Sequence, residues 1–418
     1  KSETILIMKQ VICDLKKGDI ELEDVPIPKL NSNEILIKSK YSLVSLGTEK
    51  SLVEFGKGSI LQKARSQPEK VKLVLEKMKK DGVLPTLEAV FTKLNEPLPL
   101  GYSNVGEVLE IGSQVDNFTI GDRVVSNGHH AEYVAVNMNL VSKIPDDVDM
   151  KDAAFTVVGS IGLQGIRLLD PKLGDNVAVF GLGLVGQLSA QILKANGCNV
   201  LGIDIDDDKC ALANKNGIIT INPSRGDSIS SIVRNRFNVH GVDGVLITAS
   251  SKSNDIISKS ASICRKNGKI ILVGVVGLNI NRNDFYEKEL SFRVSCSYGP
   301  GRYDTNYEEK GIDYPYEYVR WTEKRNFEAF LQCLNNKTVK VENLISSQQN
   351  LKDCKQFYEL IGTTKSIANI IKYDSDNVEF SKSIKNQEYY SKNVKNASNN
   401  AAIIGAGNFT KSILLPAI

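Results

Sequence analysis

Residues 181–186 have the sequence Gly-Leu-Gly-Leu-Val-Gly and directly follow the apolar run Val177–Phe180. The apolar run predicts a buried strand, and the apolar residues Leu188 and Ile192 predict a helix after the turn. In such a unit the first glycine makes a tight turn, the second lets a pyrophosphate approach the backbone, and the third permits close helix packing. Free N–H groups at the helix N-terminus then face the phosphates. The motif therefore predicts dinucleotide contacts from Gly181, Leu182, Gly183, Leu184, Val185 and Gly186.

An acidic residue stands where the ribose of a dinucleotide is expected. Asp204 ends the next apolar run, Asn199–Ile203, about twenty residues after the glycines. A carboxylate at this point accepts hydrogen bonds from the ribose hydroxyls of NAD and repels the 2′-phosphate of NADP. The sequence therefore predicts NAD as the cofactor, whereas glycines that served only a tight turn would leave Asp204 unexplained.

The rest of the sequence pattern predicts an α/β fold that combines a β-rich region with a region of alternating strands and helices. Short alternating strands are expected at 9–40 and 105–134, and a helix is expected from Pro68 to Gly82. After Pro145 strands and helices alternate, which is typical of a doubly wound parallel sheet. Further strands are predicted at 244–248 and 269–275, and further helices at 327–334 and 351–361.

Composition excludes several classes of partner. A net charge of +3 over 418 residues gives no basis for binding nucleic acid or an anionic membrane. The longest apolar runs, such as 270–276, are too short to cross a bilayer. None of the seven cysteines forms a CxxC pair, and scattered thiols fit a reducing cytoplasm. We expect a cytoplasmic protein with a small-molecule substrate, no nucleic-acid partner and no membrane partner, and the sequence leaves a homo-oligomer open.

The two ends of the chain differ from the rest. Residues 374–400 are rich in Asn, Lys and Ser, which predicts a solvated linker. Residues 401–418 begin a second strand-and-turn unit with only two glycines, Gly405 and Gly407, so we expect an incomplete Rossmann unit without cofactor binding of its own. Met8 resembles a natural start, which makes the residues before it an expected extension.

Four motifs resemble, in order, those of the medium-chain (zinc-type alcohol) dehydrogenases. They are Gly47-Thr48-Glu49, Gly121-Asp122-Arg123-Val124, Ala131-Glu132-Tyr133-Val134 and the glycine turn at 181–186. The resemblance implies a GroES-like β-rich catalytic domain formed by 8–155 and 298–373, with a Rossmann NAD-binding domain, 156–297, inserted between them.

The same resemblance implies two further groups of cofactor contacts. Lys209, five residues after Asp204, would help to hold the adenosine ribose. Val273, Gly274 and Val275 would line the nicotinamide.

Three segments carry a narrower resemblance. Residues 100–104, 297–304 and 318–323 are similar to the N-terminal half of bacterial two-domain oxidoreductases tied to polysaccharide biosynthesis. The second half of such proteins is similar to glucose–fructose oxidoreductase and inositol dehydrogenase, and residues 401–418 resemble its start. This resemblance implies a sugar or a sugar derivative as the substrate.

The chain departs from zinc-binding members where they hold the metal. Leu46 stands at the position of a cysteine, and Tyr102-Ser103 stand at the position of His-Glu. The region near Ser160 has no cysteine, and the four-cysteine structural lobe is absent. A tetrahedral zinc needs three protein donors of the Cys, His or carboxylate type, so we expect no metal.

Without zinc, a protein group must give or take the hydroxyl proton during hydride transfer. Tyr102 is the first candidate because it occupies a ligand position, although a tyrosine that only fills the vacated space is an equal alternative. To act as a base near neutrality, its pKa would have to fall from about 10. His130 is the candidate for lowering it or for acting itself, if the fold brings the two together; the alternative is a histidine satisfied in the core.

Other polar residues near these motifs have supporting roles. Glu49 is expected to orient its neighbours, and Ser45 and Ser103 are candidates for hydrogen bonds to the substrate. His129 is expected to be exposed.

Six of the fourteen tyrosines lie between Tyr298 and Tyr318, interleaved or flanked by Arg302, Asp304, Arg320 and Trp321. Aromatic faces and bidentate donors suit a sugar or an anionic sugar derivative. An equal alternative is that this irregular segment simply packs against the cofactor domain.

The sequence therefore predicts a zinc-independent, NAD-linked oxidoreductase that interconverts an alcohol and a carbonyl, with a sugar or sugar derivative as substrate. One alternative is a quinone- or enoyl-reductase-like enzyme, a class that also lacks zinc but generally prefers NADPH. The other is a non-catalytic NAD-binding scaffold for a partner dehydrogenase domain. The alternatives differ in whether Tyr102 and His130 converge on the nicotinamide.

Overall fold

The computed structural model describes residues 7–374 except 67, 82–85, 87–89, 91–95, 227, 238 and 361–365, and beyond 374 it describes only 410, 414 and 415. The chain divides into two compact units, and the elements considered below belong to the unit Ile7–Glu379. The linker predicted at 374–400 and the second Rossmann unit predicted at 401–418 lie almost entirely outside the described residues.

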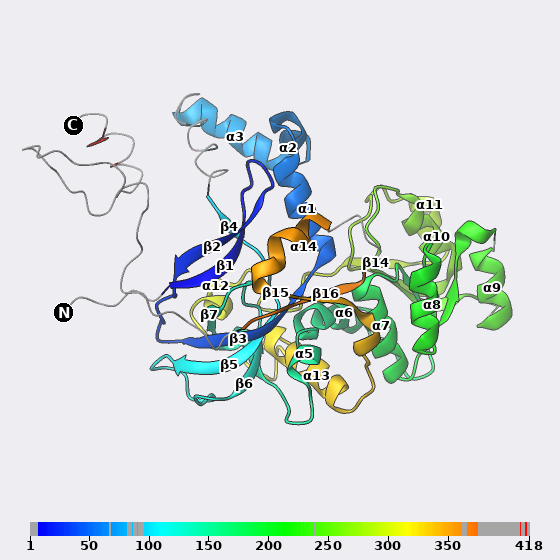
Figure 1. Cartoon of the computed structure of the whole chain (residues 1–418). Helices are drawn as coiled ribbons and strands as arrows, with labels where there is room; N and C mark the ends of the chain where they lie inside the picture. The colour runs from blue at the N-terminus through cyan, green and yellow to red at the C-terminus, as the bar shows by residue number, and fades with distance from the viewer. Residues whose placement is uncertain are drawn as a thin grey trace, which may run out of the picture. The chain divides into compact units, whose positions relative to one another are not determined.

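A six-stranded parallel sheet forms the part of the unit that contains the glycine turn (Figure 1). Its strands, in spatial order, are β11 (Ile219–Ile221), β10 (Asn199–Ile203), β9 (Asn176–Phe180), β12 (Val242–Ile247), β13 (Cys264–Leu272) and β14 (Ser291–Val294). The order runs outward from β9 in both directions, as in a doubly wound dinucleotide-binding fold. Ligands of such sheets bind at the carboxyl ends of the strands, where the order reverses, and the glycine turn lies at this point. The predicted parallel sheet is confirmed.

Alternate residues of the central strand face two different hydrophobic cores. Val177 and Val179 belong to the core that also contains helices α6 (Thr156–Leu169) and α7 (Leu184–Ala195). Ala178 and Phe180 belong to the core on the other face. Both faces of a parallel sheet are normally covered, which explains the uninterrupted apolar run of β9. The remaining helices of this region are α8 (Asp207–Lys215), α9 (Ile229–Arg236), α10 (Asp255–Ile263) and α11 (Arg282–Tyr286).

The predicted β-rich region forms two further sheets. The larger one contains β15 (Ile345–Asn350), β16 (Ala368–Lys372), β3 (Glu34–Val44), β5 (Asn104–Ile111), β6 (Arg123–Ser126) and β8 (Val141–Lys143), with β7 (Tyr133–Asn137) paired to β3. The smaller one contains β2 (Ile20–Pro26), β1 (Ile7–Cys13) and β4 (Leu98–Pro99). The antiparallel pairing of β16 with β3 brings the C-terminal part of the unit back to its N-terminal part.

Helices beside these sheets follow the predicted pattern with small shifts. α1 (Leu46–Lys57), α2 (Ile60–Ser66) and α3 (Pro68–Asp81) form the insertion, and α3 begins at the predicted proline. The other helices are α5 (Met150–Ala153), α12 (Thr305–Glu308), α13 (Glu323–Asn335) and α14 (Cys354–Leu360). The strand expected from Ala131 begins only at Tyr133, because Ala131 forms an isolated bridge with Gln10 instead. Within the part of the chain described, no helix has both the length and the apolar character needed to cross a membrane.

A buried carboxyl group lies where α13 begins. The Glu323 side chain is fully buried, and neither carboxyl oxygen has a hydrogen-bond partner among the residues that the structure describes. Burial, followed by the negative charge of Glu308, raises the pKa of Glu323 to about 8. The carboxyl group is therefore protonated in the folded protein at neutral pH.

Candidate active site

Each glycine of the turn after β9 has the environment that its expected role requires. Gly181 has a φ of +93°, a backbone conformation that residues with a side chain rarely adopt. A Cβ on Gly186 would lie 1.9 Å from the Gly181 carbonyl oxygen, so helix and turn are in contact there. A Cβ on Gly183 would meet nothing within 4 Å, which leaves open space beside the backbone at the start of α7. The turn thus has the cradle that a pyrophosphate needs at a helix N-terminus.

Asp204 lies immediately after β10 and contacts the glycine turn itself. Its Oδ2 accepts a hydrogen bond of 2.6 Å from the Leu182 N–H, and its Oδ1 accepts one of 2.9 Å from the Asp206 N–H. A carboxylate has about four acceptor positions, so two or so remain for ribose hydroxyls. The carboxylate therefore has a structural role that the sequence analysis did not include.

Lys209 lies on α8, close to the same turn. Its Nζ is 3.8 Å from Asp206 Oδ2, and its carbonyl oxygen accepts a hydrogen bond of 2.9 Å from Gln187 Nε2 on α7. The backbone of Lys209 is therefore tied to the helix that begins at the glycine turn, and its ammonium group lies near the Asp206 carboxylate.

Residues 273–275 follow β13 at the same edge of the sheet. A Cβ on Gly274 would lie 2.1 Å from the Ala249 carbonyl oxygen, so this position accepts only glycine without a shift. Val275 exposes 72% of its surface, as a residue that lines an open cofactor site would. Val273 contacts α6 at Gly165.

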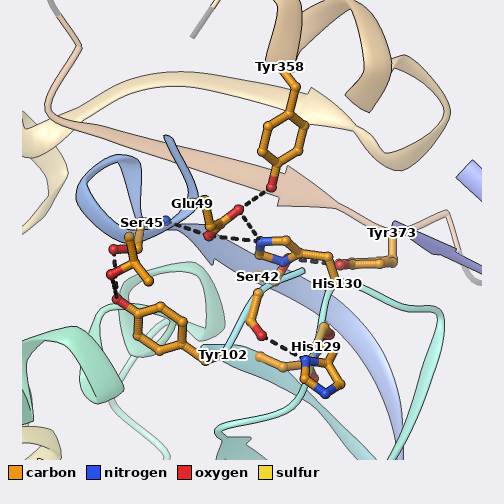
Figure 2. Close-up of polar contacts among 11 residues, drawn as sticks. Ser42, Ser45, Glu49, Tyr102, His129, His130, Tyr358 and Tyr373 are labelled. Atoms are coloured by element: carbon orange, nitrogen blue, oxygen red, sulfur yellow. Dashed lines mark hydrogen bonds and ion pairs between the residues drawn. The ribbon is translucent and has the colours of Figure 1, made fainter. Parts of the chain in front are cut away.

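Tyr102 lies in a group of hydroxyls at the beginning of α1 (Figure 2). Its phenol donates a hydrogen bond of 2.6 Å to Ser45 Oγ and is 3.4 Å from Thr48 Oγ1. Burial raises the pKa of Tyr102, and the hydrogen bonds of the phenol with Ser45 and Thr48 oppose this effect less strongly. The phenol is therefore a neutral proton donor. The structure does not support the hypothesis that its pKa falls far enough for it to act as a base.

Glu49 and His130 form a second, fully buried polar group beside the first one. Glu49 accepts hydrogen bonds from the Ser45 N–H at 2.8 Å, from the Tyr358 hydroxyl, and from His130 Nε2 at 3.3 Å. His130 Nδ1 lies 2.7 Å from Ser42 Oγ, which in turn is 2.8 Å from the Tyr373 hydroxyl. Figure 2 shows these side chains converging from separate segments.

Among the hydrogen bonds of the described residues, none joins His130 to Tyr102. Both of its ring nitrogens are engaged, and no part of the ring is exposed. The two groups are linked only through Ser45, whose N–H bonds Glu49 and whose hydroxyl bonds Tyr102. This geometry is that of the core-satisfied histidine, and it explains why His130 does not lower the pKa of Tyr102.

The other predicted polar residues divide between site and core. Ser45 belongs to the site through Tyr102, whereas Ser103 is buried and donates to the Ala154 carbonyl oxygen at 2.6 Å. Ser103 therefore has no hydroxyl proton left for a substrate. His129 is exposed as expected, with Nδ1 at 2.8 Å from the Gly101 carbonyl oxygen.

Sequence reasoning missed four hydroxyl groups of this region. Thr48 stands inside the motif that was recognised, so its position was the available signal. Ser42, Tyr358 and Tyr373 join the Glu49 and His130 group from distant parts of the chain, and no local spacing marks them.

The donors at the Tyr102 position do not fit a tetrahedral zinc. Nearby groups are the hydroxyls of Ser45, Thr48 and Tyr102, and the one carboxylate, Glu49, already accepts three hydrogen bonds. Across the described ranges, no group of three or more His, Cys, Asp or Glu side chains is arranged to hold a metal ion. Zinc requires three such donors.

The tyrosine-rich segment combines packed and exposed rings. Tyr298 and Tyr307 are buried, and Tyr314 stacks on Tyr307 with ring centroids 5.5 Å apart. Tyr303 and Tyr318 expose 75% and 87% of their surfaces, and Tyr316 is also exposed. Half of the segment therefore packs, as one alternative expected, and half remains available to a ligand.

Comparison with known proteins gives matches over most of the described unit. A family model described as "Zinc-binding dehydrogenase" matches residues 185–313, and one described as "Alcohol dehydrogenase GroES-like domain" matches residues 77–146. An alcohol dehydrogenase of Moraxella sp. (strain TAE123) is 30% identical over 241 residues, which cover 48% of this chain and 70% of that protein. D-guloside 3-dehydrogenase of Escherichia coli (strain K12) is 28% identical over 257 residues, covering 59% of this chain and 68% of that protein.

A solved structure supports the fold. The crystal structure of 2R,3R-butanediol dehydrogenase from Bacillus subtilis superimposes with a TM-score of 0.65 at 21% identity, covering 87% of this chain and 99% of that one. The predicted combination of a GroES-like part and a Rossmann sheet is confirmed. The residue boundaries of the domains remain predictions.

Two glycine variants separate packing from cofactor contact. Gly186→Ala should lower the free energy of unfolding by about 1–3 kcal/mol, because its methyl group overlaps the Gly181 carbonyl oxygen. Gly183→Ala should leave stability unchanged and weaken NAD binding about tenfold or more, because its methyl group enters space the pyrophosphate needs. Denaturant unfolding and calorimetric titration with NAD measure the two effects. Wild-type affinity in Gly183→Ala would contradict the assignment of this turn.

Proposed function

Because the chain belongs to the medium-chain, zinc-type alcohol dehydrogenase family, we propose that it interconverts an alcohol and a carbonyl of a sugar derivative with NAD and without a metal ion. Membership makes it an NAD(P)-dependent oxidoreductase acting on small alcohol- or sugar-type substrates. The metal-free part of the proposal rests on the cluster of three side-chain hydroxyls formed by Tyr102, Ser45 and Thr48.

The preference for NAD over NADP is supported by Asp204. Its carboxylate lies at the end of β10 with two backbone N–H donors, so its charge is held in place beside the turn. A 2′-phosphate there would face this negative charge at short range, where repulsion is strong. The ribose hydroxyls of NAD, in contrast, are donors that a carboxylate can accept.

The choice of a sugar derivative has two supports. D-guloside 3-dehydrogenase is among the relatives, and its name gives a sugar derivative as its substrate. The site offers several hydroxyl groups, which suit hydrogen bonds to a polyol. On the resemblance of residues 100–104, 297–304 and 318–323 we propose a role in polysaccharide biosynthesis.

In the proposed mechanism Tyr102 is the proton donor to the substrate oxygen. NAD supplies or accepts the hydride when it is bound. During reduction the phenol transfers its proton to the developing alkoxide, and the hydrogen bond that Ser45 accepts from the phenol in the resting site is broken. Thr48 lies 3.4 Å from the phenol oxygen and stabilises the phenolate by donating to it until the phenolate regains a proton from water.

Glu49 and His130 act on this group only by positioning. Glu49 accepts a hydrogen bond from the Ser45 N–H, and the carboxyl group is itself held by hydrogen bonds from His130 and Tyr358 (Figure 2). Because Ser45 begins α1 and contacts Tyr102, this hydrogen bond orients the acceptor of the phenol.

Tyr102→Phe tests the proton donor. We expect kcat to fall by about 10²–10⁴-fold, because the phenyl ring keeps the shape but cannot donate a proton. NAD affinity should stay within error, since the phenol is part of a group separate from the glycine turn. Tyr286→Phe, at an exposed position outside both proposed sites, is the matched control and should retain full activity. The mechanism is wrong if Tyr102→Phe turns over a sugar substrate at the wild-type rate.

Asp204→Asn tests the cofactor preference while its amide oxygen can still accept the Leu182 N–H. We expect NAD to bind about 10–100-fold more weakly, from the loss of a charged hydrogen-bond acceptor worth about 1.5–3 kcal/mol. NADP should lose far less affinity or gain some. Asp208→Asn, on the following helix α8, removes an equal charge and should change the affinity for neither NAD nor NADP. Equal wild-type affinities for NAD and NADP would refute the preference.

Metal analysis tests zinc independence. Protein purified without chelators should contain far less than one zinc per chain, because the hydroxyl donors at this site bind zinc poorly. Incubation with a chelator should leave turnover and melting temperature unchanged. One zinc per chain together with loss of turnover on chelation would overturn the metal-free proposal and leave the NAD assignment standing.

A further inference from the structure

Five side chains from three segments alternate between arginine and aromatic ring, and we refer to them as the arginine–aromatic ladder. The Cζ of Arg167, on α6, is 3.1 Å from the Trp321 ring centroid, and the Cζ of Arg320 is 3.8 Å from the same centroid. Arg320 is also 4.8 Å from the Tyr316 ring centroid, which Arg325 on α13 approaches at 5.1 Å. The ladder therefore brings three guanidinium groups close together.

Only one of these cations has a carboxylate partner. Arg325 pairs with Asp313 and donates to the Val319 carbonyl oxygen at 2.9 Å. Neither Arg167 nor Arg320 forms an ion pair with any residue the structure describes, and Arg167 Nε donates to the neutral Asn326 Oδ1 at 3.0 Å. Burial, and after it the positive charge of Arg320, lowers the pKa of Arg167 to about 10. The two unpaired cations destabilise one another, and an anion would remove that repulsion.

The ladder is open to a ligand. Arg320 is exposed, and the Tyr316 ring keeps 52% of its surface in solvent. A guanidinium group offers a planar fork of donors that matches carboxylate and phosphate oxygens. An exposed aromatic ring beside it offers an apolar face to the C–H side of a sugar ring.

We propose that the arginine–aromatic ladder is a binding site for an anionic sugar derivative, a sugar phosphate or a uronate, whose oxyanion is held by Arg167 and Arg320. The ladder is a separate site from the cluster of hydroxyls formed by Tyr102, Ser45 and Thr48. No hydrogen bond joins the two among the residues that the structure describes. Binding at the ladder does not depend on the reaction proposed for Tyr102, so one proposal can be wrong while the other holds. Packing accounts for the buried Tyr298, whose ring centroid lies 5.3 Å from that of Phe327 on α13, and for the buried Tyr307. It gives no reason for two arginines without a carboxylate partner on one indole ring.

The chain has a single tryptophan, Trp321, so its fluorescence reports on the ladder alone. The full chain is titrated with glucose 6-phosphate, glucuronate, inorganic phosphate and glucose. We expect a saturable change in emission with either anionic sugar, a weaker affinity for inorganic phosphate and no response to glucose. No saturable response to either anionic sugar overturns the proposal. Equal affinities for inorganic phosphate and glucose 6-phosphate overturn its sugar component.

Arg320→Gln is the decisive variant, because its exposed side chain can be replaced without disturbing the core. Affinity for the anionic sugars should fall by about 10–100-fold, as expected for a lost hydrogen bond to a charged group. Arg282→Gln is the matched control, since Arg282 is also exposed and lies over an aromatic ring, Tyr286, at 3.9 Å. It should bind as wild type does. If Arg320→Gln binds like wild type, or both variants weaken equally, the ligand is bound elsewhere or by net charge and the proposal is wrong.

Discussion

The arrangement of the catalytic region depends on one buried carboxylate. Glu49 is shielded from water, and a buried charge is tolerated only when hydrogen-bond donors surround it. Its donors include His130, 81 residues away in sequence, and Tyr358, 309 residues away. The same carboxylate holds the backbone of Ser45, the acceptor of the Tyr102 phenol. The hydroxyl site at the surface of the catalytic region is therefore fixed by a charge in its interior.

The cofactor turn could be predicted because its physics is local. Gly181 needs a positive φ and Gly186 a close contact inside the same turn, and both requirements can be inferred from neighbouring residues. Tyr102 could be singled out from its motif, but its hydrogen-bond partners Ser45 and Thr48 could not. Tyr373 reaches Ser42, which bonds His130, through the pairing of β16 with β3, and no spacing along the chain encodes that pairing.

The aromatic segment marks a different limit of prediction. Composition alone favoured packing and ligand binding equally, because a tyrosine has both an apolar ring and a polar hydroxyl. The fold separates the two roles within one segment, since Tyr307 is enclosed and Tyr316 stands beside two arginines in solvent. Which ring is enclosed depends on long-range contacts, such as those of Tyr307 with Asn139 and with Lys324 on α13. The sequence could therefore identify the aromatic segment but not which of its rings are buried.

The protonated carboxyl group of Glu323, at the start of α13, makes the stability of the fold depend on pH. An unfolded chain releases the Glu323 proton near the ordinary value of 4.5, whereas the folded chain keeps it up to about 8. Folding at neutral pH therefore takes up a proton from the solvent, and the stability linked to this group declines as pH rises between those values. The heat of unfolding consequently includes the ionisation heat of whichever buffer accepts the released proton. Folding and unfolding of the protein are therefore linked to the binding and release of one proton at Glu323.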